Sequence, residues 1–263
     1  MADIALIMCD DYTGKIERRK HYIPSTLYYL KGAFEKHGMQ TNIYNPYETD
    51  ETLDSLANEI RYSGARAIGI SASSQGSVME SLQKMCKELG RLGLPIIIGG
   101  YSTIYQNVLD GLPEVSAAVL GEGDESGPLV FEKYLNGELP HDIPGVKYRD
   151  GDQIIFTGKP VLVRDLDSIT PDYGLVKKRD DGIYATLYTS RGCYNACTFC
   201  FSRFIHGKGI RAESAEKTIR DITVLAERYG VQHISFNDDD FLFKAGRIDA
   251  IAETLRKYNI VIS

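Results

Sequence analysis

The sequence lacks the features that would place it in a membrane, outside the cell or on a nucleic acid. No apolar run approaches the ~20 residues that a membrane-spanning helix needs. Residues 1–8 form an apolar, strand-like run without the basic segment that opens a signal peptide. The formal net charge is −6 and no basic stripe is present, which argues against nucleic acid as the main partner. We therefore expect a cytoplasmic protein that binds neither a membrane nor nucleic acid.

Cysteine is also scarce, with five residues in 263, and its distribution is uneven. Cys9 and Cys86 stand apart in the sequence, and for both we expect a buried, reduced thiol. Cys193, Cys197 and Cys200 instead form a Cys-x3-Cys-x2-Cys motif. Disulfides are not expected, because three closely spaced thiols cannot all pair and no secretion signal is present.

The rest of the composition is ordinary, with 43% hydrophobic and 25% charged residues. Within residues 1–145, short apolar runs alternate with segments of helical period. Five alternations with short connections predict an α/β domain with a doubly wound parallel sheet of flavodoxin-like size. Strands are predicted at 3–8, 41–44, 67–71, 95–100 and 117–120, and helices at 25–34, 52–62, 78–92, 106–112 and 126–134.

Small or polar residues lie at the carboxyl ends of three of these strands, where ligands of such sheets bind. They are Ser71, Ser73, Gly99, Gly100, Tyr101 and Glu122. Small side chains at strand ends let a flat ligand approach the backbone, although ordinary strand-to-helix turns have the same composition. No phosphate loop is present, because residues 121–125 are acidic and would repel a phosphate.

The cysteine motif follows a predicted strand at 183–188, where parallel α/β folds place their chemistry. Three thiolates on so short a loop can hold three irons of a cubane cluster and leave the fourth iron open. An open position is typical of catalytic metal sites, whereas structural sites are closed. The alternative is a zinc site in which His206 joins the three cysteines.

Further along, a helix is predicted at 214–229, a strand at 231–236, a helix at 247–258 and the opening of a strand at 259–263. Asn237, Asp238 and Asp239 follow the strand at 231–236. Between the two halves, residues 146–163 predict a hairpin with a turn at 150–152, and an irregular connector follows.

These motifs together resemble a known family. The cysteine spacing and its setting resemble the radical S-adenosylmethionine (SAM) superfamily. The ordered series of segments 98–101, 119–125 and 143–149 is similar to the cobalamin-binding domain found ahead of many radical SAM domains. The resemblance spans essentially the whole chain.

The resemblance implies a 4Fe–4S cluster, SAM and cobalamin as cofactors. Cys193, Cys197 and Cys200 would ligate the cluster, whose open iron binds SAM and cleaves it to a 5′-deoxyadenosyl radical. Phe199 would lie near the adenine. An acidic pair is common in the family at the position of Asn237, Asp238 and Asp239, where carboxylates favour the SAM ammonium. The alternative for this acidic run is a turn that caps the following helix.

For the first domain, the resemblance implies a cobalamin site lined by the strand-end residues Ser71, Ser73, Gly99, Gly100, Tyr101 and Glu122. The Asp-x-His-x-x-Gly signature of other cobalamin proteins is absent, and neither His21 nor His37 matches it. No histidine is therefore expected beneath the cobalt.

The reaction implied is methyl transfer to an unactivated carbon, with ring-forming and oxidative chemistries as family alternatives. We expect a small-molecule or peptide substrate and an electron donor such as a flavodoxin. The expected domains are 1–145, cobalamin binding; 146–182, hairpin and linker; and 183–263, the N-terminal part of a radical SAM (β/α) partial barrel. The family barrel has six units, so the sequence predicts a truncated barrel. The alternative is a non-catalytic or split-enzyme half that needs a second chain.

Overall fold

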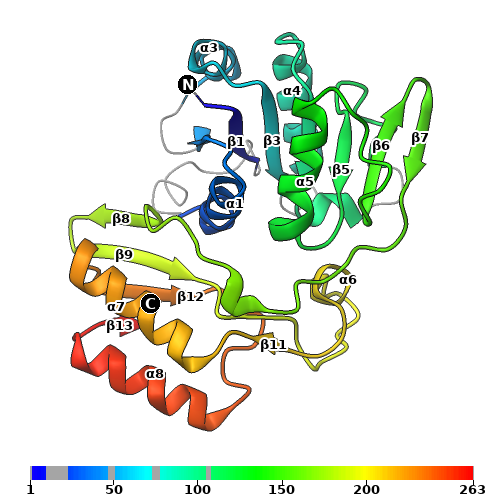
Figure 1. Ribbon diagram of the computed structural model, residues 1–263. Helices are drawn as coiled ribbons and strands as arrows, with labels where there is room; N and C mark the ends of the chain where they lie inside the picture. The colour runs from blue at the N-terminus through cyan, green and yellow to red at the C-terminus, as the bar shows by residue number, and fades with distance from the viewer. Residues whose placement is uncertain (1, 10–22, 47–50, 73–77, 105–107, 263) are drawn as a thin grey trace. The chain divides into compact units, whose positions relative to one another are not determined.

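The structure is a computed structural model that describes residues 2–9, 23–46, 51–72, 78–104 and 108–262 (Figure 1). The chain divides into two compact units, Met1–Val163 and Arg164–Ser263. Each unit has its own sheet. No described helix is long and apolar enough to cross a membrane.

In its described part, the first unit contains a seven-stranded sheet with the order β2-β1-β3-β4-β5-β6-β7. Five of these strands are parallel: β1 (Ile4–Cys9), β2 (Thr41–Tyr44), β3 (Ala67–Ala72), β4 (Ile96–Gly99) and β5 (Ala117–Val119). Their order is the flavodoxin-like order of doubly wound sheets, which confirms the predicted fold class.

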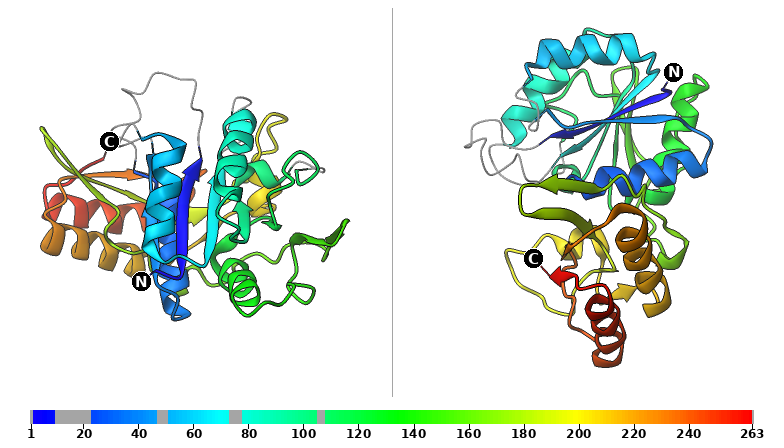
Figure 2. Two further views of the ribbon diagram at one scale, coloured as in Figure 1. Left: turned by 90° about the horizontal axis from the view of Figure 1, so that it is seen from above. Right: turned by 90° about the vertical axis from the view of Figure 1, so that its left-hand side faces the viewer.

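Helices cover both faces of this sheet (Figure 2). One face carries α1 (Ser25–Lys36) and α5 (Gly123–Leu135), and the other carries α3 (Leu53–Ser63) and α4 (Val78–Gly90). Strand β1 is buried along its whole length because its residues alternate between the two cores. Ala5, Ile7 and Cys9 join the core under α3 and α4, and Ile4, Leu6 and Met8 join the core under α1 and α5.

The predicted hairpin is present as β6 (Val146–Asp150) and β7 (Gln153–Phe156). Because β6 pairs antiparallel with β5, the hairpin extends the sheet of the first unit. The unit therefore runs to Val163, beyond the boundary expected after residue 145. Local sequence periodicity indicates a hairpin but does not show which strand it joins.

The helix expected at 106–112 lies partly outside the described residues. Its remaining positions, 108–111, form a turn and not a helix. Gly111 and Pro113 leave no room for a second helical turn.

In its described part, the second unit contains a four-stranded sheet with the order β13-β12-β9-β8. Strands β9 (Gly182–Leu187), β12 (His233–Phe236) and β13 (Val261–Ile262) are parallel, and β8 (Val176–Arg179) is antiparallel to β9. Helices α7 (Ala215–Tyr229) and α8 (Ala245–Lys257) connect the parallel strands. The arrangement is that of successive βα units, as predicted.

The start of α7 follows from a local signal in the sequence. Ser214 is its N-cap, and the Ser214 side chain accepts a hydrogen bond from the backbone N–H of Lys217 at 3.1 Å. Gly230 ends the helix in the left-handed conformation.

Candidate functional site

The three clustered cysteines lie on a loop that leaves the carboxyl end of β9. The loop is closed at its neck by β10 (Ser190–Arg191) and β11 (Arg211–Ala212), which pair antiparallel. The short helix α6 (Ser202–His206) forms part of the loop. We call residues 192–210 the cysteine loop.

The cysteine side chains are accessible to iron or to another metal. Cys197 is exposed, Cys193 and Cys200 are partly exposed, and none forms a disulfide. Asn195 donates from its backbone N–H to the sulfur of Cys193 at 3.4 Å and from Nδ2 at 3.5 Å. Hydrogen bonds to cysteine sulfur are one means by which proteins adjust the properties of iron–sulfur clusters.

Three thiols on one accessible loop are the donor set that a 4Fe–4S cluster requires when one iron is left open. Among the residues that the structure describes, however, no three His, Cys, Asp or Glu side chains are arranged to hold a metal ion. The donor chemistry fits the cluster, although the sulfurs are not gathered as ligation requires. The same finding applies to the zinc alternative with His206.

The acidic residues after β12 lie against the start of the cysteine loop. The N–H of Asn237 donates to the carbonyl of Leu187 at 2.8 Å, which extends the pairing of β9 and β12 by one residue. Asp238 then accepts hydrogen bonds from the N–H of Thr189 at 2.6 Å and from its hydroxyl at 2.6 Å. A third hydrogen bond comes from the hydroxyl of Ser190 at 2.9 Å.

Asp239 contacts the loop further along. Its Oδ2 accepts from the N–H of Gly192 at 2.9 Å and from the hydroxyl of Ser202 at 2.7 Å. The structure thus brings together the two motifs that the sequence placed around one cofactor. Their direct contact was not predicted.

Aromatic side chains on the cysteine loop are highly exposed. Phe199, expected beside the adenine of SAM, is 83% exposed, and Tyr194 is 71% exposed. An exposed aromatic face is suited to stacking on a planar base.

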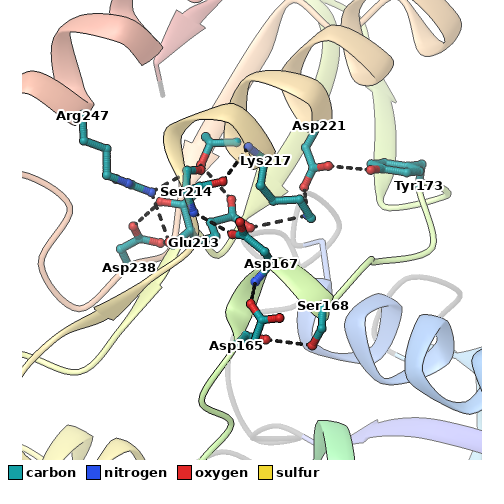
Figure 3. Close-up of polar contacts among 12 residues, drawn as sticks. Asp165, Asp167, Ser168, Tyr173, Glu213, Ser214, Lys217, Asp221, Asp238 and Arg247 are labelled. Atoms are coloured by element: carbon teal, nitrogen blue, oxygen red, sulfur yellow. Dashed lines mark hydrogen bonds and ion pairs between the residues drawn. The ribbon is translucent and has the colours of Figure 1, made fainter.

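Sequence reasoning missed a buried charged cluster next to the loop (Figure 3). Lys217 pairs with Glu213 at 3.4 Å and, more closely, with Asp221, and all three side chains are almost fully buried. The hydroxyl of Tyr173 donates to Asp221 at 2.6 Å. The spacing of four residues between these charges is a visible signal, but it is also typical of exposed helix surfaces.

Thr189 links this charged cluster to the acidic residues after β12, Asp238 and Asp239, which we call the acidic turn. Its carbonyl accepts from Nη2 of Arg247 at 3.1 Å and from the backbone N–H of Glu213 at 3.1 Å. Burial lowers the pKa of Arg247, while the charges of Asp238 and Glu213 act in the opposite direction. Thr189, which lies between β9 and the cysteine loop, is therefore hydrogen-bonded both to Asp238 and to the side of the charged cluster.

Those candidate cobalamin residues that the structure describes lie at the carboxyl edge of the first sheet. Ser71 and Gly99 are direct partners at the ends of β3 and β4. A Cβ added at Gly99 would have no heavy atom of the described residues within 4 Å, so the described part of the edge is open there. Gly100 has φ +86°, and a Cβ there would lie 2.6 Å from the carbonyl oxygen of Ala72. Only glycine fits this position without strain.

The other candidate residues of the first unit are less uniform. Tyr101 begins the 3-10 helix η2 (Tyr101–Ile104). Glu122 is buried and accepts a hydrogen bond from the N–H of Val163 at 2.8 Å, a structural contact that sequence reasoning did not anticipate. Ser73 and His21 lie outside the described residues. His37 follows α1 where the chain returns to the start of β2, at the opposite edge from Gly99.

The predicted burial of the two isolated cysteines is confirmed. Cys9 and Cys86 lie in the core under α3 and α4. Burial raises the pKa of the Cys86 thiol well above its usual range.

Comparison with known proteins finds similarity over both units of the chain. Residues 15–130 match the family model of the B12 binding domain. An uncharacterised methyltransferase of Pyrococcus horikoshii is 26% identical over 249 residues, which cover 91% of this chain and 54% of the relative. The anaerobic magnesium-protoporphyrin IX monomethyl ester cyclase of Cereibacter sphaeroides is 26% identical, with coverage of 87% and 39%. The chain therefore spans about half the length of these relatives or less.

Solved structures share the fold over almost all of this chain. TsrM from Kitasatospora setae, a radical SAM methyltransferase with cobalamin and a 4Fe–4S cluster bound, superposes with a TM-score of 0.73 at 15% identity. The match covers 98% of this chain and 51% of TsrM. The cobalamin-dependent SAM radical enzyme OxsB, with aqua-cobalamin and SAM bound, gives 0.76 at 20% identity over 100% of this chain and 38% of OxsB. Residues 15–130 thus match the B12 binding domain, and almost the whole chain shares its fold with solved cobalamin-dependent radical SAM enzymes.

Proposed function

We propose that the chain binds cobalamin on its first unit and a 4Fe–4S cluster with SAM on its second, and acts in methyl transfer to an unactivated carbon. One observation carries the proposal: three accessible cysteines lie on a loop at the end of the first parallel strand of the second unit, in a chain whose first unit matches the B12 binding domain over residues 15–130. Methyltransferases among the relatives support the reaction class.

Each residue type in the second unit suits its proposed partner. Cys193, Cys197 and Cys200 would ligate the cluster, which when bound supplies the electron that cleaves SAM. Phe199 has an exposed ring for the adenine. The turn at 237–239 would attract the SAM ammonium. Both loop contacts of Asp239 end on Oδ2, so among the described residues Oδ1 is left to accept from an ammonium.

In the first unit, the open edge at Gly99 and the close backbone approach at Gly100 favour a flat ligand over the strand ends. The residues proposed around cobalamin are Ser71, Ser73, Gly99, Gly100, Tyr101 and Glu122. His37 lies at the opposite edge of the sheet, which supports binding without that histidine beneath the cobalt.

The proposal also specifies partners and a compartment. The substrate would be a small molecule or a peptide, and a protein such as a flavodoxin would donate the electron. The thiols need a reducing compartment, for which we propose the cytoplasm. A second chain would be required if the remaining barrel strands come from another polypeptide.

The proposal is tested by Cys197→Ala. After anaerobic reconstitution with iron and sulfide, this variant should lose the iron and labile sulfide that the parent protein binds, because two thiolates cannot hold a cubane securely. Cys86→Ala is the matched control, since it removes a buried thiol outside the loop and should leave the cluster intact. Electron paramagnetic resonance of the reduced parent protein, with and without SAM, then reports whether the open iron binds SAM.

The outcomes distinguish a cluster ligated by the three cysteines, a zinc site and a binding half that needs further strands. Full iron content in Cys197→Ala contradicts the ligand assignment. One zinc per chain without labile sulfide supports the zinc site. A cluster whose electron paramagnetic resonance spectrum does not change when SAM is added supports the alternative, a binding half that needs further barrel strands.

A further inference from the structure

Residues 193–200, which contain the three cysteines, are called the cysteine segment. The residues on both sides of this segment donate hydrogen bonds to a single carboxylate oxygen. Oδ2 of Asp239 accepts from the N–H of Gly192 and from the hydroxyl of Ser202, at 2.9 and 2.7 Å. Gly192 immediately precedes Cys193, and Ser202 begins α6 just after Cys200. All three cysteines therefore lie between two donors that meet on one atom. We call these two hydrogen bonds the Asp239 bridge.

We infer that Asp239 is a positioning residue for the 4Fe–4S cluster. The Asp239 bridge ties the beginning and the end of the cysteine segment to the turn after β12, and thereby presents the cysteines for cluster assembly. This inference rests on the proposed function and adds a role that the cysteine motif does not contain.

The backbone at Gly192 is shaped for this contact. Gly192 has φ +87°, and a Cβ there would collide with the carbonyl oxygen of Gly209, on the other side of the loop's neck. The start of the loop thus packs directly on its end, with the N–H of Gly192 directed to Asp239. A residue with a side chain could not adopt this arrangement without displacing one of the two segments.

The side chains of the neighbouring Asp238 and Asp240 do not bind both sides of the cysteine segment. Asp238 accepts from Thr189 and Ser190, which lie before the cysteine loop begins. Asp240 contacts the loop's neck through its backbone carbonyl, which Ser190 approaches at 3.5 Å. Among the described residues, Asp239 alone of the three binds both flanks of the cysteine segment by its side chain.

The charge of Asp239 strengthens both contacts. Hydrogen bonds from N–H and O–H groups to a carboxylate are roughly twice as strong as those between neutral groups. Because both bonds of the Asp239 bridge end on a carboxylate oxygen, they hold the two sides of the cysteines more firmly than a neutral acceptor would.

The experiment compares Asp239→Ala with Asp239→Asn. Alanine removes the acceptor, so hydrogen exchange at the Gly192 amide of the apo protein should become at least about tenfold faster. The Thr189 amide, which is bonded to Asp238, should be unaffected. Iron and labile sulfide after reconstitution should fall at least about threefold. Asparagine keeps one acceptor oxygen for both donors and should restore most of the cluster.

The matched control is Asp240→Ala, which removes a carboxylate from the same turn while leaving the Asp239 bridge intact. Its Gly192 exchange rate and iron content should equal those of the parent protein. Equal values in Asp239→Ala and Asp240→Ala would overturn the inference. If the parent protein takes up no iron and sulfide, the proposed function fails, and exchange at Gly192 still decides whether the Asp239 bridge exists.

Discussion

At the scale of single residues, the charged cluster beside the cysteine loop is unusual because one buried cation faces two buried carboxylates. Lys217 contacts both Glu213 and Asp221, and none of the three side chains is more than 5% exposed. One ammonium cannot compensate two carboxylates away from water. Burial is the largest cause that raises the pKa of Glu213, to about 7, and the charge of Lys217 opposes it.

This shift predicts a specific dependence of stability on pH. The folded state holds a proton on Glu213 that the unfolded state releases, since the pKa rises on folding from 4.5 to about 7. The stabilisation is complete below the lower value and is lost as the pH rises through the higher one. At about 1.4 kcal/mol per pH unit, the contribution is at most about 3.5 kcal/mol.

Glu213→Gln should therefore reduce the loss of thermal stability between about pH 5 and about pH 8. Melting temperatures of the apo protein across this range provide the measurement. The control is Glu216→Gln, because Glu216 lies three residues further along the chain, in the first turn of α7, but is exposed. An identical pH slope in Glu213→Gln and in the parent protein would contradict the assignment.

At the scale of elements, the conformation of the cysteine loop depends mainly on its neck, where β10 pairs with β11. Strands β10 and β11 pair through only two residues each, and the close approach of Gly192 to Gly209 lies next to them. Asp238 and Asp239 then attach the loop to the end of β12. The position of the cysteines thus depends on the pairing of β9 with β12, which aligns Leu187 with Phe236.

Gly192→Ala should disrupt the loop and lower its cluster content. The left-handed backbone costs about 1–3 kcal/mol for a residue with a Cβ, and the collision with Gly209 adds to that cost. Gly209→Ala provides a matched control, because Gly209 has φ +84° but an added Cβ meets nothing within 4 Å. Iron and sulfide content should fall further in Gly192→Ala than in Gly209→Ala. Equal losses would show that backbone strain alone accounts for the effect.

At the scale of the whole molecule, each unit places its candidate ligand residues at the carboxyl ends of parallel strands. Ser71 and Gly99 do so in the first sheet, and the cysteine loop and acidic turn do so in the second. Each location is where parallel α/β sheets leave strand ends accessible. The proposed cobalamin site and the proposed cluster site can therefore be tested separately.

Gly99→Leu should weaken cobalamin binding without unfolding the apo protein, because an added Cβ at this position has open space around it. The larger side chain would occupy the edge proposed for the corrin ring, and we expect a loss of affinity of about tenfold or more, equivalent to at least about 1.4 kcal/mol. Titration with hydroxocobalamin, followed by visible absorption, measures the affinity.

The controls for this prediction are internal to the chain. Gly99→Ala should have a smaller effect than Gly99→Leu, and neither variant should change iron or sulfide content, because the cysteines belong to the other unit. Unchanged affinity in Gly99→Leu would remove Gly99 from the proposed cobalamin site.

Much of this protein follows from the sequence by itself, because the signals concerned are local. Apolar runs and helical periods identified the parallel strands and most helices, and Ser214 marked the start of α7. The spacing of Cys193, Cys197 and Cys200 indicated a cluster, because it alone places three thiols on one short loop. Strand-end glycines marked the accessible edge of the first sheet.

Other features were decided only by the tertiary structure, because they join residues far apart in the chain. Asp239 and Gly192 are 47 positions apart, and their hydrogen bond exists only once β9 and β12 pair in register. The same spacing of Glu213, Lys217 and Asp221 would occur on an exposed helix, and packing alone buries it. Likewise, β6 is a hairpin strand in sequence but extends the first sheet only because β5 offers it a free edge. Local patterns specify elements and donor atoms, whereas strand pairing and burial determine which of them act together.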